Sequence, residues 1–139
     1  ISSASQTAMT LSDQFCVDRH KSHFLNLVEN KLDIIFANEQ EIKSLIDEKD
    51  FRDVIDFSKQ LNKLVVITRG EKGAVSIKGE KIDECAAKKN IEIKDLTGAG
   101  DLFAAGFLHG YVNRLSIKQC LEKGTEMSSR VIQQIGARL

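Results

Sequence analysis

Apolar residues are arranged in two ways along the chain, as short continuous runs and at helical spacing. Short runs of β-branched and other apolar residues predict strands at 8–11, 33–38, 64–68, 74–78 and 81–86. Elsewhere apolar residues recur at helical spacing, which predicts helices at 14–30, 39–47, 50–61, 98 to about 112, and 117 to about 135. Asn38 with Glu41, and Ser116 with Gln119, have the spacing of a capping box at a helix start.

The order of these elements predicts an α/β fold. Strands and helices alternate before a small antiparallel excursion and two closing helices, so we expect a layered domain with a mainly parallel sheet and helices on both faces. Ligands bind such sheets beyond the carboxyl ends of the strands, where loops lead into helix starts. Three loops are therefore candidates: 37–41, 68–73 and 95–101.

Composition narrows the range of partners. The 139 residues suffice for one domain, and 20 basic residues balance 20 acidic ones, which argues against a general nucleic-acid or anionic-membrane surface. No apolar run approaches the length of a membrane span. Three widely spaced cysteines suit free thiols in a reducing compartment. We expect a cytoplasmic protein with a small-molecule substrate, no nucleic acid and no membrane partner.

The stretch TGAGD (97–101) carries the clearest chemistry. A helix start exposes unpaired N–H groups and a partial positive charge, and the small residues Gly98, Ala99 and Gly100 leave room for an anion to reach them. Asp101 beside such a cradle would accept a proton from a hydroxyl that attacks a bound phosphate. The alternative is structural: a glycine-rich helix start whose aspartate complements the helix dipole.

The longer stretch DLTGAGDLFAAGF (95–107) resembles the signature D-T-x-G-A-G-D-x-F of the ribokinase-like (PfkB) family of sugar and nucleoside kinases, departing only at Leu96. In that family the glycine-alanine-glycine backbone forms an anion hole and the following aspartate is the catalytic base. The resemblance assigns these roles to Gly98, Ala99, Gly100 and Asp101.

Two further loops agree with the family in order and spacing. NEQE (38–41) resembles its N-x-x-E motif, which implies that Asn38 and Glu41 organise Mg²⁺ and phosphate through water. TRGEKG (68–73) resembles its T-x-G-x-x-G segment, which lies along the nucleotide. The resemblance implies ATP-binding positions at Asn38, Thr68, Gly70, Gly73, Thr97, Thr125 and Ser128, the last two near the adenine. It also implies a monovalent cation, K⁺ in some members, near Asp95, Thr97 and Gly136.

The capping box offers a second explanation for one of these motifs. Asn38 and Glu41 at a helix start are explained by local hydrogen bonds alone, and both roles can coexist.

The resemblance is strongest to adenosine kinase-type members, through LSDQFCV (11–17), DIIFANEQE (33–41) and GFLHGY (106–111). It implies transfer of the γ-phosphate of ATP to a primary hydroxyl of a nucleoside or sugar. The alternatives are a sugar kinase of the ribokinase or fructokinase type, and a non-catalytic nucleotide-binding α/β module.

The resemblance covers nearly the whole chain but begins midway through the family's sequence. We therefore expect residues 1–139 to form the C-terminal, nucleotide-binding portion of a kinase domain, truncated on the N-terminal side, with the acceptor and lid portion absent. Such a piece is expected to bind ATP weakly and to transfer little or no phosphate on its own.

Overall fold

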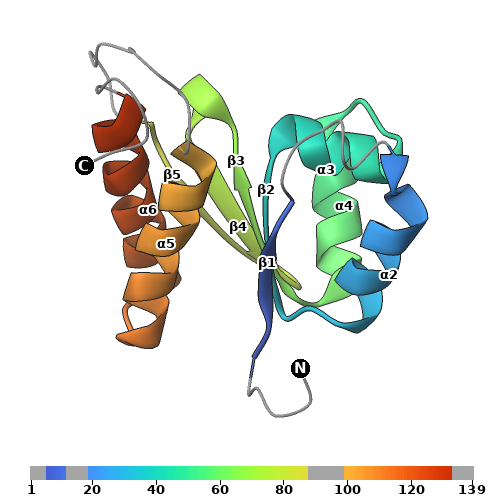
Figure 1. Ribbon diagram of the computed structural model, residues 1–139, viewed down its shortest axis with the longest axis horizontal. Coiled ribbons are helices and arrows are strands. Elements are labelled where there is room, and N and C mark those ends of the chain that lie inside the picture. Colours follow the sequence, from blue (N-terminus) through green and yellow to red (C-terminus); the bar gives the residue numbers. More distant parts are fainter. Residues whose placement is uncertain (1–5, 12–18, 88–98, 133–139) are drawn as a thin grey trace. The chain divides into compact units, whose positions relative to one another are not determined.

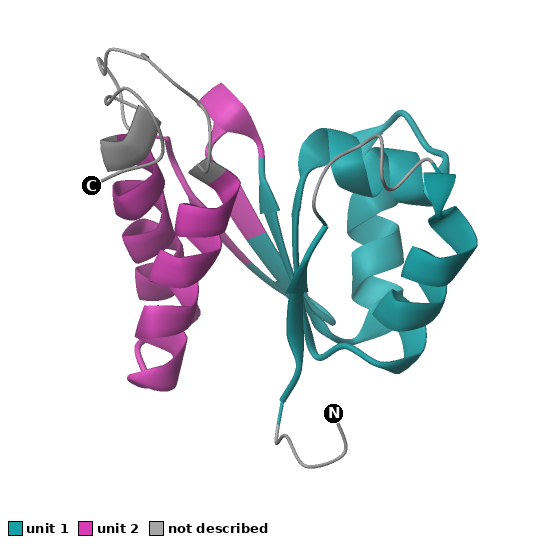
Figure 2. Cartoon of the chain, viewed as in Figure 1, with its two compact units in different colours: residues 1–68, 76–82 teal, residues 69–75, 83–139 magenta. Residues whose placement is uncertain are grey.

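The computed structural model describes residues 6–11, 19–87 and 99–132. The chain divides into two compact units (Figure 2). Unit 1 comprises residues 1–68 and 76–82, and unit 2 comprises residues 69–75 and 83–139. Strand β4 is shared between the units, because its first residues belong to unit 2 and the others to unit 1.

The helices and strands follow the predicted order (Figure 1). They are β1 (Ala8–Thr10), α2 (Lys21–Asn30), β2 (Ile34–Asn38), α3 (Glu39–Ile46), α4 (Phe51–Leu61), β3 (Leu64–Thr68), the 3-10 turn η1 (Gly70–Lys72), β4 (Ala74–Lys78), β5 (Lys81–Cys85), α5 (Ala99–Val112) and α6 (Ile117–Ile132).

The five strands form one sheet in the order β1-β2-β3-β4-β5. The pairs β1–β2 and β2–β3 are parallel, with Ile35 opposite Val65 and Asn38 opposite Thr68. The connections after β3 and β4 are far too short for a parallel crossover, so β4 and β5 form the antiparallel part of the sheet. The expected α/β fold, with a parallel sheet and an antiparallel excursion, is confirmed.

Unit 1 has its core around β2 and β3. Both strands are buried on both faces over their first four residues, as expected of strands inside a parallel sheet. Helix α3 contacts β2, β3, α2 and α4. Its Ile42 and Leu45, together with Val54 of α4, are fully buried or nearly so. These packed elements hold the start of α3 in place.

The prediction of one continuous helix over residues 14–30 was wrong at His20, because Arg19 and Lys21 are helical and the residue between them is not. Helix α2 begins at Lys21, and the backbone of His20 lies outside the helical region, with φ −132° and ψ 38°. The apolar spacing of Val17, Phe24 and Val28 continues across this point, so periodicity gave no sign of the interruption. Residues 12–18 lie outside the described part of the chain.

Unit 2 is built on the helix pair α5 and α6, which lie side by side (Figure 1). Phe103 and Phe107 of α5 are buried, as the helical spacing predicts. The predicted capping box at the start of α6 is also present: Ser116 N–H donates to Gln119 Oε1 at 3.1 Å, and Gln119 N–H donates to Ser116 Oγ at 3.2 Å. The short connection between the two helices makes them antiparallel.

Candidate active site

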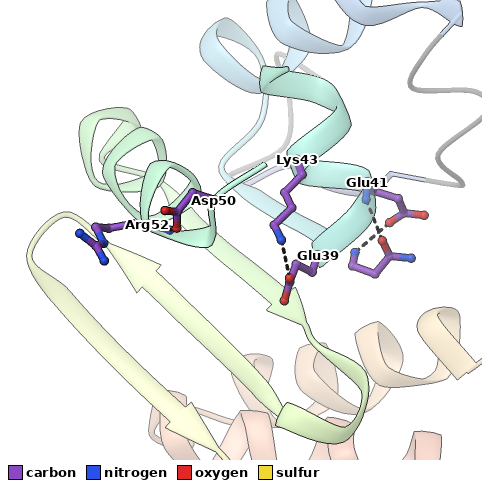
Figure 3. A network of polar contacts seen from close by, with 6 residues as sticks. Glu39, Glu41, Lys43, Asp50 and Arg52 are labelled. Carbon is purple, nitrogen blue, oxygen red and sulfur yellow. Dashed lines mark hydrogen bonds and ion pairs between the residues drawn. The ribbon is translucent and has the colours of Figure 1, made fainter. Parts of the chain in front are cut away.

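The start of α3 is held by a complete capping box (Figure 3). Glu41 N–H donates to Asn38 Oδ1 and Asn38 N–H donates to Glu41 Oε1, each at 2.8 Å. The Glu41 side chain is buried, and Lys43 pairs with Glu39 at 2.6 Å on the same turn. The helix N-terminus favours these carboxylates, so the local structure alone accounts for both motif residues.

Asn38 also lies where a ligand of a parallel sheet would bind. It pairs with Thr68, so the last residues of β2 and β3 stand next to each other at the carboxyl edge of the sheet. The Asn38 Nδ2 amide makes no hydrogen bond to any residue that the structure describes. Unit 1 therefore brings together three predicted site residues, Asn38, Glu41 and Thr68. At this carboxyl edge of the sheet, the Asn38 Nδ2 amide has no hydrogen-bond acceptor among the described residues.

The turn after β3 needs its glycines for structural reasons. Arg69 N–H donates to Gly73 O at 2.7 Å, which closes the turn. Gly73 has φ +91°, and a Cβ there would lie 2.1 Å from the carbonyl oxygen of Cys85. Gly70 has φ +58°. Because L-residues rarely adopt such angles, the turn itself explains Gly70 and Gly73.

The start of α5 shows the opposite situation. Gly100 has no positive φ, and a Cβ built on it would meet no atom within 4 Å among the described residues. The next residue, Asp101, is exposed in the first helical turn and makes no hydrogen bond or ion pair within the described ranges. Glycine costs up to about 1 kcal/mol in a helix relative to alanine. No contact among the described residues explains that cost at Gly100.

The glycines further along the helix pair are explained by close packing. A Cβ on Gly106 would lie 2.8 Å from Lys123 O, and one on Gly124 would lie 2.8 Å from Phe103 O. This antiparallel register continues toward the start of α5, so Asp101 and Ser128 lie at the same end of the pair.

The nucleotide-side candidates on α6 already have hydrogen-bond partners. Thr125 is buried, and its Oγ1 lies 3.6 Å from the Sγ of Cys85 at the end of β5. Ser128 Oγ donates to Thr125 O at 3.2 Å. Cys85 was not among the predicted site residues. It is separated from Thr125 by 40 positions, so no local sequence pattern could have indicated this contact.

The two described cysteines differ in environment. Both are free, but Cys85 is half-buried and Cys120 is fully buried in α6. Burial raises the pKa of the Cys120 thiol, and a backbone hydrogen bond and Lys123 oppose that shift only in part. Cys120 is therefore a core residue.

Several predicted site residues lie in parts of the chain that the structure does not describe. Asp95, Thr97, Gly98 and Gly136 lie outside the described residues, and so does the side chain of Ala99. Within residues 6–11, 19–87 and 99–132 there is no group of three His, Cys, Asp or Glu side chains that could hold a metal ion. In the same ranges no helix has the length and hydropathy that crossing a bilayer requires.

The sheet order, the helix pair and the loops at its edge define a ribokinase-like α/β layered fold. A comparison with protein families matches residues 2–139 to the pfkB family of carbohydrate kinases. The chain belongs to this family.

Individual relatives agree with this assignment. A cytidine kinase from Thermococcus kodakarensis is 36% identical over 114 residues, which are 81% of this chain and 41% of that protein. Among solved structures, the adenosine kinase from Sinorhizobium meliloti has a TM-score of 0.93 and 41% identity. A probable sugar kinase from Rhizobium etli has a TM-score of 0.92 and 44% identity. The chain covers 41% of each of these two structures, with 96% of its own length aligned.

Proposed function

We propose that this chain is the nucleotide-binding portion of an ATP-dependent kinase that transfers the γ-phosphate to a primary hydroxyl of a nucleoside or sugar. The observation that carries the proposal is the start of α5, where no described contact explains Gly100 and the exposed Asp101 has no hydrogen-bond or ion-pair partner among the described residues. Membership of the pfkB family supports it, and so do relatives named cytidine kinase and adenosine kinase.

The chemistry follows from the electrostatics of a helix start. Free backbone N–H groups there attract a phosphate, and Gly100 carries no side chain to obstruct its approach. In this proposal the backbone of Gly98, Ala99 and Gly100 holds the transferring phosphoryl group. The Asp101 carboxylate orients the acceptor hydroxyl and accepts its proton as the oxygen attacks phosphorus.

Asn38, Glu41 and Thr68 would act on the phosphate side of the nucleotide. Oxygen donors suit Mg²⁺, which keeps several waters when protein-bound, so the Glu41 carboxylate would hold the ion through water. Bound Mg²⁺ would neutralise charge on the phosphates. The spare Asn38 amide would donate to the nucleotide or to one of these waters.

The nucleoside end of ATP would be bordered by Gly70, Gly73, Thr125 and Ser128. The turn at 70–73 has positive φ at both glycines and no room for a Cβ at Gly73, and the two hydroxyl residues lie on one helix of the same unit. Thr97 is proposed as a further nucleotide contact. Asp95, Thr97 and Gly136 are proposed to border a monovalent cation, with K⁺ as the candidate.

The acceptor contacts are proposed to lie in the part of the relatives that this chain does not span. On that basis the 139 residues alone should bind ATP weakly and transfer little or no phosphate, because transfer needs the acceptor aligned and water excluded. A nucleoside is the proposed acceptor, with a sugar as the alternative, since relatives of both kinds are similar to this chain. The free thiols suit the proposed cytoplasmic location.

The test joins this chain to the N-terminal part of the Sinorhizobium meliloti adenosine kinase and measures ATP binding and adenosine phosphorylation. Asp101→Asn should lower kcat by about 10²- to 10⁴-fold, the usual contribution of a general base, while ATP affinity is retained. The matched control is Asp56→Asn, which alters an exposed carboxylate on α4 and should change neither quantity. Unchanged kcat in Asp101→Asn would remove the proposed base. ATP binding without any transfer in the unmodified chimera would favour the non-catalytic module.

A further inference from the structure

Cys85 joins two parts of unit 2 that the proposed function places beside the nucleotide. Its carbonyl oxygen occupies the space that a Cβ on Gly73 would need, at 2.1 Å. Its side chain reaches α6, where Sγ lies 3.6 Å from Thr125 Oγ1. Lys118 of α6 also donates to the carbonyl oxygen of Glu84, which ties the end of β5 to that helix a second time.

Either atom of the contact between Cys85 and Thr125 could be the donor, but only one arrangement makes both hydrogen bonds of the thiol. In that arrangement the thiol proton points to Ala86 O, 3.5 Å from Sγ, because a carbonyl oxygen only accepts. Sγ then has no proton for Thr125, and the Thr125 hydroxyl donates its own proton to sulfur. Both lone pairs of Thr125 Oγ1 are left as acceptors.

An oriented acceptor distinguishes between purine bases. Adenine presents an exocyclic amino group, which donates, where guanine presents a carbonyl oxygen, which accepts. A freely rotating threonine hydroxyl could serve either base, because it can donate or accept. A hydroxyl that has already given its proton to sulfur can only accept, and therefore favours adenine where it faces the 6-position of the purine, since the other donors of guanine lie elsewhere on the ring.

We propose that Cys85 is a positioning residue for base recognition, which holds the Thr125 hydroxyl as an acceptor and so selects ATP over GTP. This inference rests on the proposed function, because it needs a nucleotide base to lie against α6. It adds to that proposal a residue and a source of nucleotide specificity.

The experiment uses the 139-residue chain and measures its dissociation constants for ATP, GTP and inorganic tripolyphosphate by calorimetry. The unmodified chain should prefer ATP. Cys85→Ala should reduce the ATP-to-GTP preference about three- to tenfold, the effect of one net hydrogen bond, by freeing the Thr125 proton. Affinity for tripolyphosphate, which has no base, should not change.

A second variant tests the same contact from its other partner. Thr125→Val keeps the side-chain shape without the hydroxyl and should reduce the preference to a similar degree. In the Thr125→Val background, Cys85→Ala should have no further effect, because the two residues act as one unit. Cys120→Ala is the matched control, since it removes a thiol from the same unit without touching Thr125, and it should leave the preference unchanged.

The outcomes separate the two proposals. Equal affinity of the unmodified chain for ATP and GTP, or an unchanged preference in Cys85→Ala, would overturn the role of Cys85 and leave nucleotide binding intact. The same loss of preference in Cys120→Ala would also overturn it, because the effect would then be a general loosening. Absence of ATP binding by the unmodified chain would overturn the proposed function and this inference together.

Discussion

The starts of α3 and α5 are two solutions to the same electrostatic problem. At α3 the free N–H groups meet Asn38 and Glu41, whose reciprocal hydrogen bonds are both 2.8 Å long. At α5 the exposed Asp101 makes no such bond within the described residues, and Gly100 leaves open space. The first start is stabilised by its own sequence, whereas at the second the described residues supply no such cap.

The source of rigidity also differs between the two. The geometry of α3 is set locally by its cap. The described part of α5 is held by packing against α6, where backbone atoms approach so closely that Gly106 and Gly124 have no room for a Cβ. Packing farther along α5 therefore fixes this helix without a side-chain cap from the described residues.

Gly124→Ala is expected to have the largest effect on stability. The added Cβ would lie 2.8 Å from Phe103 O and 3.0 Å from the Phe103 ring, and backbone cannot move aside cheaply. We expect a loss of about 1–3 kcal/mol, typical of overpacking, measured by urea unfolding. Phe103 lies two residues after Asp101, so phosphoryl transfer in the chimera should fall as well.

The control for this variant is Glu122→Ala, at an exposed position of the same helix, which should change stability by no more than about 0.5 kcal/mol. Equal stability of Gly124→Ala and the unmodified chain would show that tight packing does not hold α5. The difference in rigidity between the starts of α3 and α5 would then be wrong.

Asn38→Ala should have the next largest effect. It removes the side-chain cap and leaves the Glu41 N–H without its hydrogen-bond acceptor, which costs about 1 kcal/mol in typical helices. Urea unfolding measures this loss. A change below about 0.3 kcal/mol would mean that the capping box does not determine the start of α3.

Glu41→Gln is the matched control, because glutamine keeps a hydrogen-bond acceptor for the Asn38 N–H but has no charge. Its loss of stability should be smaller than that of Asn38→Ala, because only the interaction of the charge with the helix N-terminus is removed. Any added role in holding Mg²⁺ would appear separately, as a higher Mg²⁺ concentration needed for ATP binding.

Much of the fold could be predicted from local signals. The runs 64–68 and 74–78 became β3 and β4 with unchanged bounds, because β-branched residues bounded by turn residues specify buried strands. The Asn38 and Ser116 caps were equally local and are both present. The interruption before α2 was missed, because it is a change in backbone angle at His20 inside an unbroken apolar pattern.

The candidate site could be predicted only in part. The family resemblance predicts that Gly70 and Gly73 lie along a nucleotide, and their φ angles and the carbonyl of Cys85 give a structural reason for both glycines as well. Gly100 keeps its functional interpretation, because no described contact explains it. The contact between Cys85 and Thr125 depends on how β5 lies against α6, which no local pattern in the sequence encodes.

Gly100→Ala should have the smallest effect on stability, and one of opposite sign to the others. A Cβ there meets nothing described within 4 Å, and alanine is the better helix former, so the free energy of unfolding should rise by up to about 1 kcal/mol.

ATP affinity, measured by calorimetry, should nevertheless fall at least about tenfold in Gly100→Ala. The new methyl group would keep a phosphate from the backbone N–H groups, and a hydrogen bond to a charged group contributes about 1.5 kcal/mol or more. Gly110→Ala, the same substitution toward the far end of α5, should leave ATP affinity unchanged, and its stability will show whether Cys120 Sγ, 3.2 Å from the new Cβ, can move aside. If Gly100→Ala is more stable and binds ATP as well as the unmodified chain, the open start of α5 is only a poorly capped helix end, and its difference from α3 has no functional meaning.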